Sequence, residues 1–257
     1  ILSSEYVSSI SFVGSTPVAK YIYEPSAKYG KRVQSLGGAK NHLIVMPDAN
    51  IEQATNGIIG AAFGSAGERC MAVSVAVAVG NIADELIENI KNSAESLKVA
   101  PYTDQSSDMG PVISKDHRSK IHEYIQSGID EGANLIMDGR KIKIQGYENG
   151  YFLGPTIFDN VNNSMKIYQE EIFGPVLSIV RAKNYDEALS LVNNHKFGNG
   201  TSIYTSNGTI SRHFTSNVKI GMVGVNVPIP VPMAYHSFGG WKNSLFGDSA
   251  MHGTEGV

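Results

Sequence analysis

Residues 41–80 have the sequence NHLIVMPDANIEQATNGIIGAAFGSAGERCMAVSVAVAVG, and this stretch shows the repeating unit of the fold. Its two apolar runs, NHLIVM and AVSVAVAV, have the length and the β-branched content of buried strands. Between them, apolar residues recur at helical spacing, and Asn50 followed by Gln53 is typical of a capping box at a helix start. Gly64 and Gly67 are natural helix terminators. The stretch therefore predicts a strand, a helix and a second strand.

The same alternation continues along the rest of the chain. Further strands are expected in SISFV, RVQSLGG, ANLIMDG, VLSIVRA, TSIYTS and GMVGVNVP, and further helices over residues 17–29, 84–99, 114–131, 185–195 and 208–218. Strands that alternate with helices of crossover length predict a doubly wound, mostly parallel α/β sheet.

Composition excludes several classes of partner and site. The chain has 257 residues, a net charge of -3 and no run of basic residues, so we expect no nucleic acid or anionic membrane partner. Its apolar runs are too short to span a bilayer. A single cysteine excludes an internal disulfide framework, and the seven histidines have no HxxxH or HxH spacing, so no metal site is expected. Low cysteine content is typical of a reducing compartment.

The single cysteine, Cys70, lies in FGSAGERCMA, between the predicted helix and the second strand. A lone cysteine is most often a buried small hydrophobe. Here the small neighbours leave room for a substrate to approach the sulfur. We expect Arg69 to favour the thiolate if its guanidinium points toward the sulfur, and to suit a substrate that carries a carboxylate.

Two other segments have residue types suited to a nucleotide. Gly14 and Ser15 follow a strand and open a helix, where backbone N–H groups can hold a phosphate, although such turns cap many helices without a ligand. In QEEIFGPV, Glu171 is suited to accept hydrogen bonds from ribose hydroxyls, with Phe173 near a cofactor ring. A solvated acidic turn with a core phenylalanine is the alternative, and spacing alone favours it.

Taken together, the motifs resemble one known family. In chain order, ISFVGSTPVAKYIY, LGGAKNHLIVMPDAN, AAFGSAGERCMA, GYFLGPTIFDNV, EEIFGPVLSIV and FGGWKNSLFGD resemble the C-terminal half of an NAD-dependent aldehyde dehydrogenase. GGAKNH, GERCMA and NVPIPVP resemble the branch that oxidises methylmalonate and malonate semialdehydes to acyl-CoA. The resemblance implies that residues 1–38 are the end of a Rossmann-type NAD-binding domain and that residues 39–257 form the catalytic domain.

The resemblance also implies residue roles. Cys70 would attack the aldehyde carbon, carry the resulting thioester and contribute its backbone N–H to an oxyanion hole. Arg69 would hold the substrate carboxylate, and Phe238 would line the substrate tunnel. The cofactor NAD would contact the remaining predicted residues, with its pyrophosphate at Gly14 and Ser15, its nicotinamide ribose at Glu171 and its ring near Phe173.

One departure from the family pattern concerns the second half of the reaction. Most hydrolytic relatives have Glu-Leu-Gly-Gly where this chain has Ser35 before Leu36, and that glutamate activates the deacylating water. A serine cannot act as a general base at neutral pH, so coenzyme A is the expected acyl acceptor. A hydrolytic semialdehyde dehydrogenase, an inactive fragment of such an enzyme and a cysteine hydrolase are the alternatives.

Members of the family are about twice as long as this chain, so we expect it to be part of a longer enzyme that binds NAD poorly in isolation. The resemblance implies a small-molecule semialdehyde substrate and a homotetramer or dimer. It also implies a location in the bacterial cytoplasm or, alternatively, the mitochondrial matrix.

Overall fold

The computed structural model describes residues 1–254, and the largest element in these residues is a seven-stranded sheet. Its strand order is β10-β9-β3-β4-β7-β6-β5, and every neighbouring pair is parallel except β5 and β6. The strands are β3 (Asn41–Val45), β4 (Val73–Val79), β5 (Asn134–Met137), β6 (Thr156–Asp159), β7 (Val176–Ala182), β9 (Gly200–Tyr204) and β10 (Met222–Val225). The predicted doubly wound, mostly parallel sheet is confirmed.

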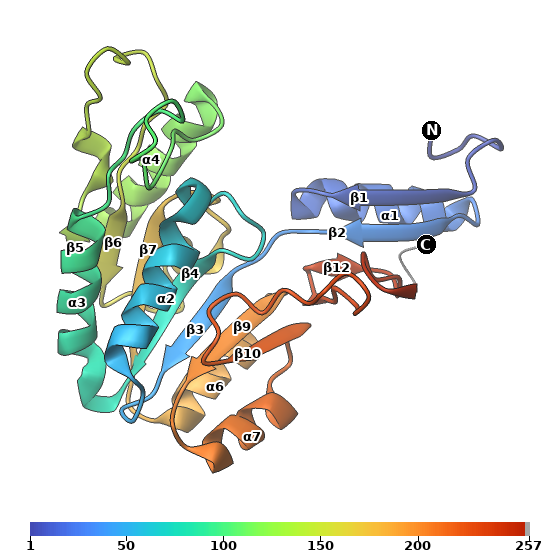
Figure 1. Ribbon diagram of the computed structural model, residues 1–257. Helices are drawn as coiled ribbons and strands as arrows, with labels where there is room; N and C mark the ends of the chain where they lie inside the picture. Colours follow the sequence, from blue (N-terminus) through green and yellow to red (C-terminus); the bar gives the residue numbers. More distant parts are fainter. Residues whose placement is uncertain (255–257) are drawn as a thin grey trace.

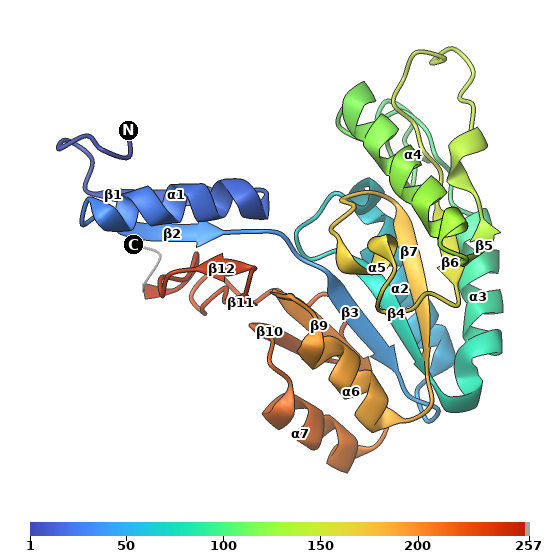
Figure 2. The ribbon, with the colours of Figure 1, turned by 180° about the vertical axis from the view of Figure 1, so that it is seen from behind.

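Helices cover both faces of this sheet. They are α2 (Ile51–Phe63), α3 (Ala83–Glu95), α4 (Lys115–Asp130), α5 (Lys166–Gln169), α6 (Tyr185–Asn194) and α7 (Gly208–Asn217). Figure 1 shows α2 in front of the sheet, and Figure 2, seen from behind, shows α6 in front. Both helices contact β4 and β7, from opposite faces. The predicted cap at Asn50 is present, since its side chain accepts a hydrogen bond from the backbone N–H of Gln53.

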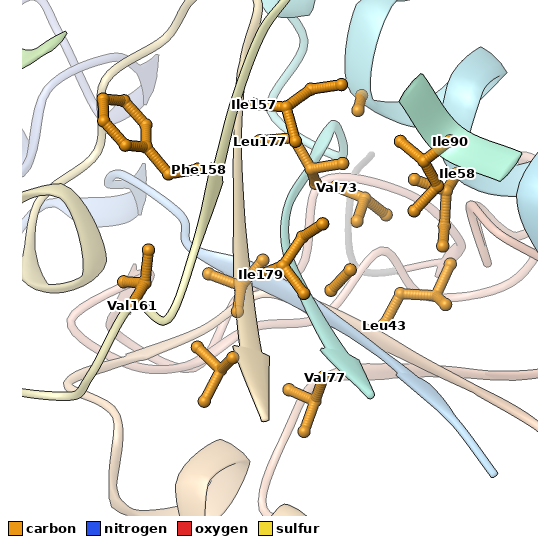
Figure 3. Packing of buried hydrophobic residues seen from close by; sticks show 14 of the residues in the cluster. Leu43, Ile58, Val73, Val77, Ile90, Ile157, Phe158, Val161, Leu177 and Ile179 are labelled. Atoms are coloured by element: carbon orange, nitrogen blue, oxygen red, sulfur yellow. The ribbon is translucent and has the colours of Figure 1, made fainter. Parts of the chain in front are cut away.

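The central strands are buried because helices cover them on both sides. All five residues of β3 are buried, and Leu43, Val77 and Ile179 have no exposed surface. Figure 3 shows these side chains with Ile58 of α2 and Ile90 of α3 in one cluster. Parallel strands covered on both faces have near-continuous apolar sequences, which is why these strands could be recognised.

A second, smaller sheet lies beside the large one. Its parallel strands β1 (Ser9–Val13) and β2 (Arg32–Leu36) are joined by α1 (Thr16–Lys28). The short β12 (Leu245–Phe246) pairs antiparallel with β2, so residues close to the C-terminal end lie against the first part of the chain. Figure 1 shows this unit projecting from the main body. The domain division at residue 38 stays a prediction.

The shortest elements escaped the sequence analysis. They are β6, α5, β12, the paired strands β8 (Phe197–Gly198) and β11 (Trp241–Lys242), and the 3₁₀ turns η1 (Gly64–Gly67), η2 (Gly80–Ile82) and η3 (Gly139–Lys141). None of these segments has more than four residues, and none carries a periodic pattern of its own. Among the described residues, no helix has both the length and the apolarity needed to cross a bilayer.

The two sheets meet end to end at the segment that joins them. Residues 37–40 lead from the carboxyl end of β2 to the amino end of β3. The loops that precede β4 and β7 lie at the same amino edge of the large sheet, because these strands are parallel to β3. The junction therefore faces the carboxyl ends of one sheet and the amino ends of the other.

Candidate active site

A cavity of about 580 Å³ lies at this junction. It is lined by Val13, Gly14, Ser15, Gly37, Cys70, His117, Lys120, Glu123, Tyr124, Lys166, Glu171, Ile172 and Phe173. The cavity thus brings together five of the predicted site residues from three separate parts of the chain: Gly14, Ser15, Cys70, Glu171 and Phe173. The residues from α4 were not predicted, because they face the cavity only once the helix is packed.

Cys70 is presented by a strained loop. Three consecutive residues before it, Ser65, Ala66 and Gly67, have φ angles of 52°, 53° and 70°. Left-handed backbone is unfavourable for residues with a side chain, and it is typical of functional loops. Gly67 also lies against the backbone of Gly174, where a Cβ would stand 2.2 Å from the carbonyl oxygen. The loop is held in this shape, and it leaves the Cys70 side chain exposed.

Two buried amides fix the backbone at Cys70. Its carbonyl oxygen accepts hydrogen bonds from Nδ2 of Asn41 at 2.9 Å and from Nδ2 of Asn199 at 3.0 Å. Both asparagines are almost fully buried. Asn41 also accepts a hydrogen bond at Oδ1 from the backbone N–H of Gly200, so it ties the Cys70 loop to two strands. Neither asparagine was predicted, although the polar Asn41 at the start of the apolar run NHLIVM was a usable signal.

The thiol itself is not activated in the way the sequence suggested. Desolvation by the surrounding protein raises the pKa of Cys70 above its ordinary value, and the carboxylate of Glu171 acts in the same direction. The backbone N–H groups of Cys70 and Met71 and the charge of Arg69 lower it, but they do not reverse the shift. Arg69 thus acts on the pKa of Cys70 in the predicted direction, but burial outweighs its charge.

The side chain of Arg69 is engaged elsewhere. Its Nη2 donates to the carbonyl oxygen of Gly60 at 2.5 Å, with Ala61 O at 3.5 Å. These carbonyls belong to the last turn of α2, where a cation is favourable for the helix dipole. Within residues 1–254, the buried Nε of Arg69 has no hydrogen-bond partner. Arg69 lines a small second cavity together with Cys70 and Glu171, and its predicted role as a carboxylate clamp stays a prediction.

Glu171 faces Cys70 from the loop that precedes β7. Its Oε1 accepts a hydrogen bond of 3.0 Å from the backbone N–H of Ala39. Burial raises the pKa of Glu171, while that hydrogen bond and the nearby Lys40 act to lower it. The alternative of a solvated acidic turn with a core phenylalanine is wrong, since Phe173 is 39% exposed and lines the cavity.

Lys40 lies behind Glu171 and was not predicted. It is buried, and its Nζ donates to the backbone carbonyl of Glu170 at 2.9 Å. Burial lowers its pKa to about 7, although the carboxylates of Glu171 and Glu170 act in the opposite direction. The segment 39–40 therefore holds both the side chain of Glu171 and the backbone beside it.

The opposite wall of the cavity is the start of α1. Ser15 is the N-cap residue, and among the described residues its side chain makes no capping hydrogen bond. Its hydroxyl and the first backbone N–H groups of the helix are therefore available to a ligand. An anion is the ligand that this helix end favours, because the dipole is positive there.

Phe238, which was predicted to line a substrate tunnel, and Ser35 do not line the cavity. Phe238 is only 4% exposed and packs in a small cluster with Leu36, Met71 and Met222. Its role in a substrate tunnel stays a prediction. Ser35 is fully buried, and its hydroxyl donates to the carbonyl oxygen of Ala19 at 2.8 Å. It therefore faces α1 and not Cys70.

A metal centre finds no support in residues 1–254, which contain no cluster of histidine, cysteine, aspartate or glutamate able to hold an ion. The buried His42 and His195 instead belong to a hydrogen-bonded group around Tyr168. His42 Nε2 lies 3.0 Å from the Tyr168 hydroxyl, and His195 Nε2 lies 3.1 Å from the Tyr168 carbonyl oxygen. These histidines have structural partners.

Comparison with known proteins gives the same picture along the whole chain. The sequence profile of the aldehyde dehydrogenase family matches residues 1–257. A malonate-semialdehyde dehydrogenase of Pseudomonas aeruginosa is 53% identical over 258 residues, which cover 100% of this chain and 52% of the relative. A relative of the same name from Bacillus anthracis is 52% identical, with 100% and 53% covered. The chain thus spans about half the length of the curated relatives it matches.

Solved structures agree. A methylmalonate-semialdehyde dehydrogenase of Oceanimonas doudoroffii matches with a TM-score of 0.97 and 52% identity, covering 99% of this chain and 52% of the other. A Sinorhizobium meliloti protein assigned to the same activity and solved with NAD matches with a TM-score of 0.98 and 58% identity. The match covers 99% of this chain and 52% of the other. A betaine aldehyde dehydrogenase of Staphylococcus aureus, in complex with NAD+, matches with a TM-score of 0.94 and 28% identity. The match covers 99% of this chain and 50% of the other.

Proposed function

The chain belongs to the aldehyde dehydrogenase family, and from that premise we propose that it carries the nucleophile and part of the cofactor site of an NAD-dependent, CoA-acylating semialdehyde dehydrogenase. One observation supports this most directly. The exposed sulfur of Cys70 shares a cavity with Glu171, Phe173 and the N-terminal end of α1. These are a nucleophile, a ribose acceptor, a ring contact and an anion site in one continuous space.

The residues of the cavity fit NAD. Ser15 leaves the helix end open for a pyrophosphate, and the second carboxylate oxygen of Glu171 is free of the bond that holds Oε1, so it suits ribose hydroxyls. The exposed ring of Phe173 suits the nicotinamide. NAD, when bound, would accept the hydride that converts the adduct on Cys70 into a thioester. NAD complexes of the Sinorhizobium meliloti and Staphylococcus aureus proteins support this assignment.

The chain's own residues would carry the covalent chemistry. Cys70 Sγ forms the bond to the aldehyde carbon after losing its proton, and the carbonyl oxygen becomes the alkoxide that needs a donor. The backbone N–H of Cys70 is the proposed donor. The hydrogen bonds from Asn41 and Asn199 to the carbonyl oxygen of Cys70 support a fixed backbone at this residue. Since the pKa of the thiol is raised, deprotonation has to be assisted by the bound substrate or cofactor, or by higher pH.

The substrate class follows from Arg69 and from the relatives. Arg69 carries a positive charge beside Cys70, and it would bind a substrate carboxylate after leaving the carbonyl oxygens of Gly60 and Ala61. The curated relatives at 52–53% identity are named for malonate semialdehyde, and the Oceanimonas doudoroffii structure is named for methylmalonate semialdehyde. We therefore propose a short aldehyde with a carboxylate at its other end.

Coenzyme A is the proposed acyl acceptor. Hydrolysis of the thioester needs a general base, and Ser35 is buried, bonded to Ala19 and chemically unsuited to that role. A thiol acceptor attacks the thioester carbon without that base, releases the Cys70 thiol and leaves as acyl-CoA. Loss of CO2 would give propionyl-CoA from methylmalonate semialdehyde and acetyl-CoA from malonate semialdehyde.

Rapid-mixing kinetics test the proposal. The protein at its natural length is mixed with NAD and methylmalonate semialdehyde, with and without CoA. We expect about one NADH per active site without CoA, because the thioester accumulates, and continuous turnover with CoA. A Cys70→Ala variant should show no burst. Full turnover in water alone would instead establish the hydrolytic enzyme.

Association between copies remains part of this proposal. The family resemblance supports a dimer or tetramer of the full-length enzyme. Large exposed apolar side chains near the C-terminal end, among them Met233, Tyr235 and Trp241, are suited to burial against other protein surface. Light scattering of the protein at its natural length would give the number of subunits, and a monomer would contradict the expectation.

A further inference from the structure

Two loops flank the cavity, and the backbone of one of them requires contacts that hold its conformation. The loop of Cys70 and the loop of Glu171 and Phe173 both precede strands of the large sheet, and Phe173 has a left-handed φ of 55°. Such a backbone conformation is unfavourable for a phenylalanine and persists only where neighbouring groups hold it. Its exposed ring is also poorly held by packing, since 39% of the residue is accessible.

One side chain of α4 reaches both loops. The Nε2 of His117 lies 2.6 Å from the carbonyl oxygen of Phe173 and 3.4 Å from Oε1 of Glu68. A carbonyl oxygen can only accept, so Nε2 carries the hydrogen and donates it to Phe173. Glu68 lies two residues before Cys70, and its carboxylate faces the same N–H.

Glu68 and His117 are each held by a further hydrogen bond. The same oxygen of Glu68 accepts a hydrogen bond of 3.1 Å from the backbone N–H of Ile113. The backbone N–H of His117 donates to the N-cap hydroxyl of Ser114, which holds the first turn of α4 in place. The side chains of His117 and Glu68 are 20% and 14% exposed, so water competes only partly for these contacts.

Backbone packing brings the same three elements together. Gly67 of the Cys70 loop abuts Gly174, and a Cβ on Gly174 would meet the side chain of Ile121 on α4 at 2.5 Å. This packing sets the distance between the loops, but it exerts no directional hold on the carbonyl of Phe173. His117 provides that direction, because its Nε2 donates a hydrogen bond to this carbonyl.

We propose that His117 is a positioning residue that links the Cys70 loop to Phe173 and thereby fixes the aromatic wall of the cavity relative to the sulfur. The inference rests on the proposed function in one respect, namely that the ring of Phe173 meets the nicotinamide. Loss of the link would leave the sulfur in place and loosen the cofactor side of the cavity. The signature is weaker NAD binding with little change in the chemistry at saturating NAD.

Three variants of the protein at its natural length test this link. His117→Leu removes the donor, and His117→Gln keeps an N–H of similar reach. His122→Leu is the matched control, because His122 lies on the same helix and, within the described residues, its buried Nε2 has no partner. We expect His117→Leu to raise KM for NAD about fivefold to tenfold, the usual effect of one lost hydrogen bond. Its kcat should fall less than about twofold, and the other two variants should remain within about twofold of the native protein.

Hydrogen exchange supplies the second measurement. In His117→Leu the amides of residues 171–175 should exchange faster, while alkylation of Cys70 by iodoacetamide keeps its native rate. An unchanged exchange rate and KM in His117→Leu, or an equal defect in His117→Gln, would overturn the inference. If His117→Leu does not fold, His117→Asn takes its place, since its amide is too short to reach the Phe173 carbonyl. If the native protein reduces no NAD, the proposed function fails and hydrogen exchange still decides the link.

Discussion

The two sheets that enclose the cavity differ in how they are stabilised. In the large sheet, Leu43, Ile44 and Val45 of β3 have no exposed surface. In the small sheet, β1 alternates between exposed and partly exposed residues, and Val13 at its end is 52% exposed. Within the described residues, the wall that carries Cys70 is therefore built on a buried core, whereas Gly14 and Ser15 follow a strand that has no buried residue.

This difference matches two separate requirements of the proposed site, which are covalent chemistry and cofactor binding. Covalent chemistry needs a nucleophile held to a fraction of an ångström, and the Cys70 loop is tied to strands β3 and β9 by Asn41. Cofactor binding needs a surface that a ligand can enter and leave. The wall with Gly14 and Ser15 supplies the end of a helix. In the connecting segment, Ala39 donates to the carboxylate of Glu171 and Lys40 donates to the backbone carbonyl of Glu170.

The largest expected effect separates chemistry from stability within the buried wall. Cys70→Ala should lower turnover with NAD and semialdehyde at least about a thousandfold, because no other group can carry the acyl chain. Its urea midpoint should match the native protein, since the Cys70 side chain is exposed. Reduction of NAD at the native rate would remove the mechanism altogether.

A pair of truncations tests the two sheets directly. Leu43→Ala should cost about 2–5 kcal/mol of unfolding free energy, because it opens a cavity at a position with no exposed surface. Val13→Ala, at the 52% exposed end of β1, should change it by no more than about 0.5 kcal/mol. Equal losses in urea titrations would show that the small sheet has a core as tight as the large one.

The contact between the two loops of the buried wall can be tested at Gly67. Gly67→Ala places a Cβ at a φ of 70° and 2.2 Å from the carbonyl oxygen of Gly174. We expect it to lose about 2 kcal/mol of stability. Gly60→Ala is the control, since it adds a Cβ inside α2 with no described side chain within 4 Å and should gain about 0.5–1 kcal/mol. A neutral Gly67→Ala would mean that the loops are free to separate.

The last prediction concerns Lys40, in the segment that joins the two walls. Burial lowers the pKa of Lys40 from 10.5 to about 7, so between these values the unfolded chain binds a proton that the folded chain has lost. The stability of the native protein should therefore rise between pH 7 and pH 9 relative to Lys40→Met, by about 1.4 kcal/mol per pH unit. Below pH 7 the difference should be constant. Urea titrations at four pH values give the slope, and parallel curves throughout would contradict the shifted pKa.

The sequence by itself determined the alternation of strands and helices, because each long element carries its own periodic pattern. The apolar run at residues 73–79 and the capped helix after Asn50 needed no partner to be recognised. The family resemblance supplied the roles of Cys70, Glu171 and Phe173, which spacing alone did not favour. The two-residue strand β12 and its pairing with β2 stayed hidden, because a pair of residues has no period.

Only the tertiary structure decided how the site residues act on one another. It turned Arg69 toward the end of α2 and buried Phe238 and Ser35. It also raised the pKa of Cys70, because burial outweighs the charge of Arg69. It also brought His117 to the cavity from a position that carried no motif, and it placed the buried Lys40 behind Glu171. Side-chain direction, desolvation and contacts between distant segments depend on packing, and no local pattern of residues encodes them.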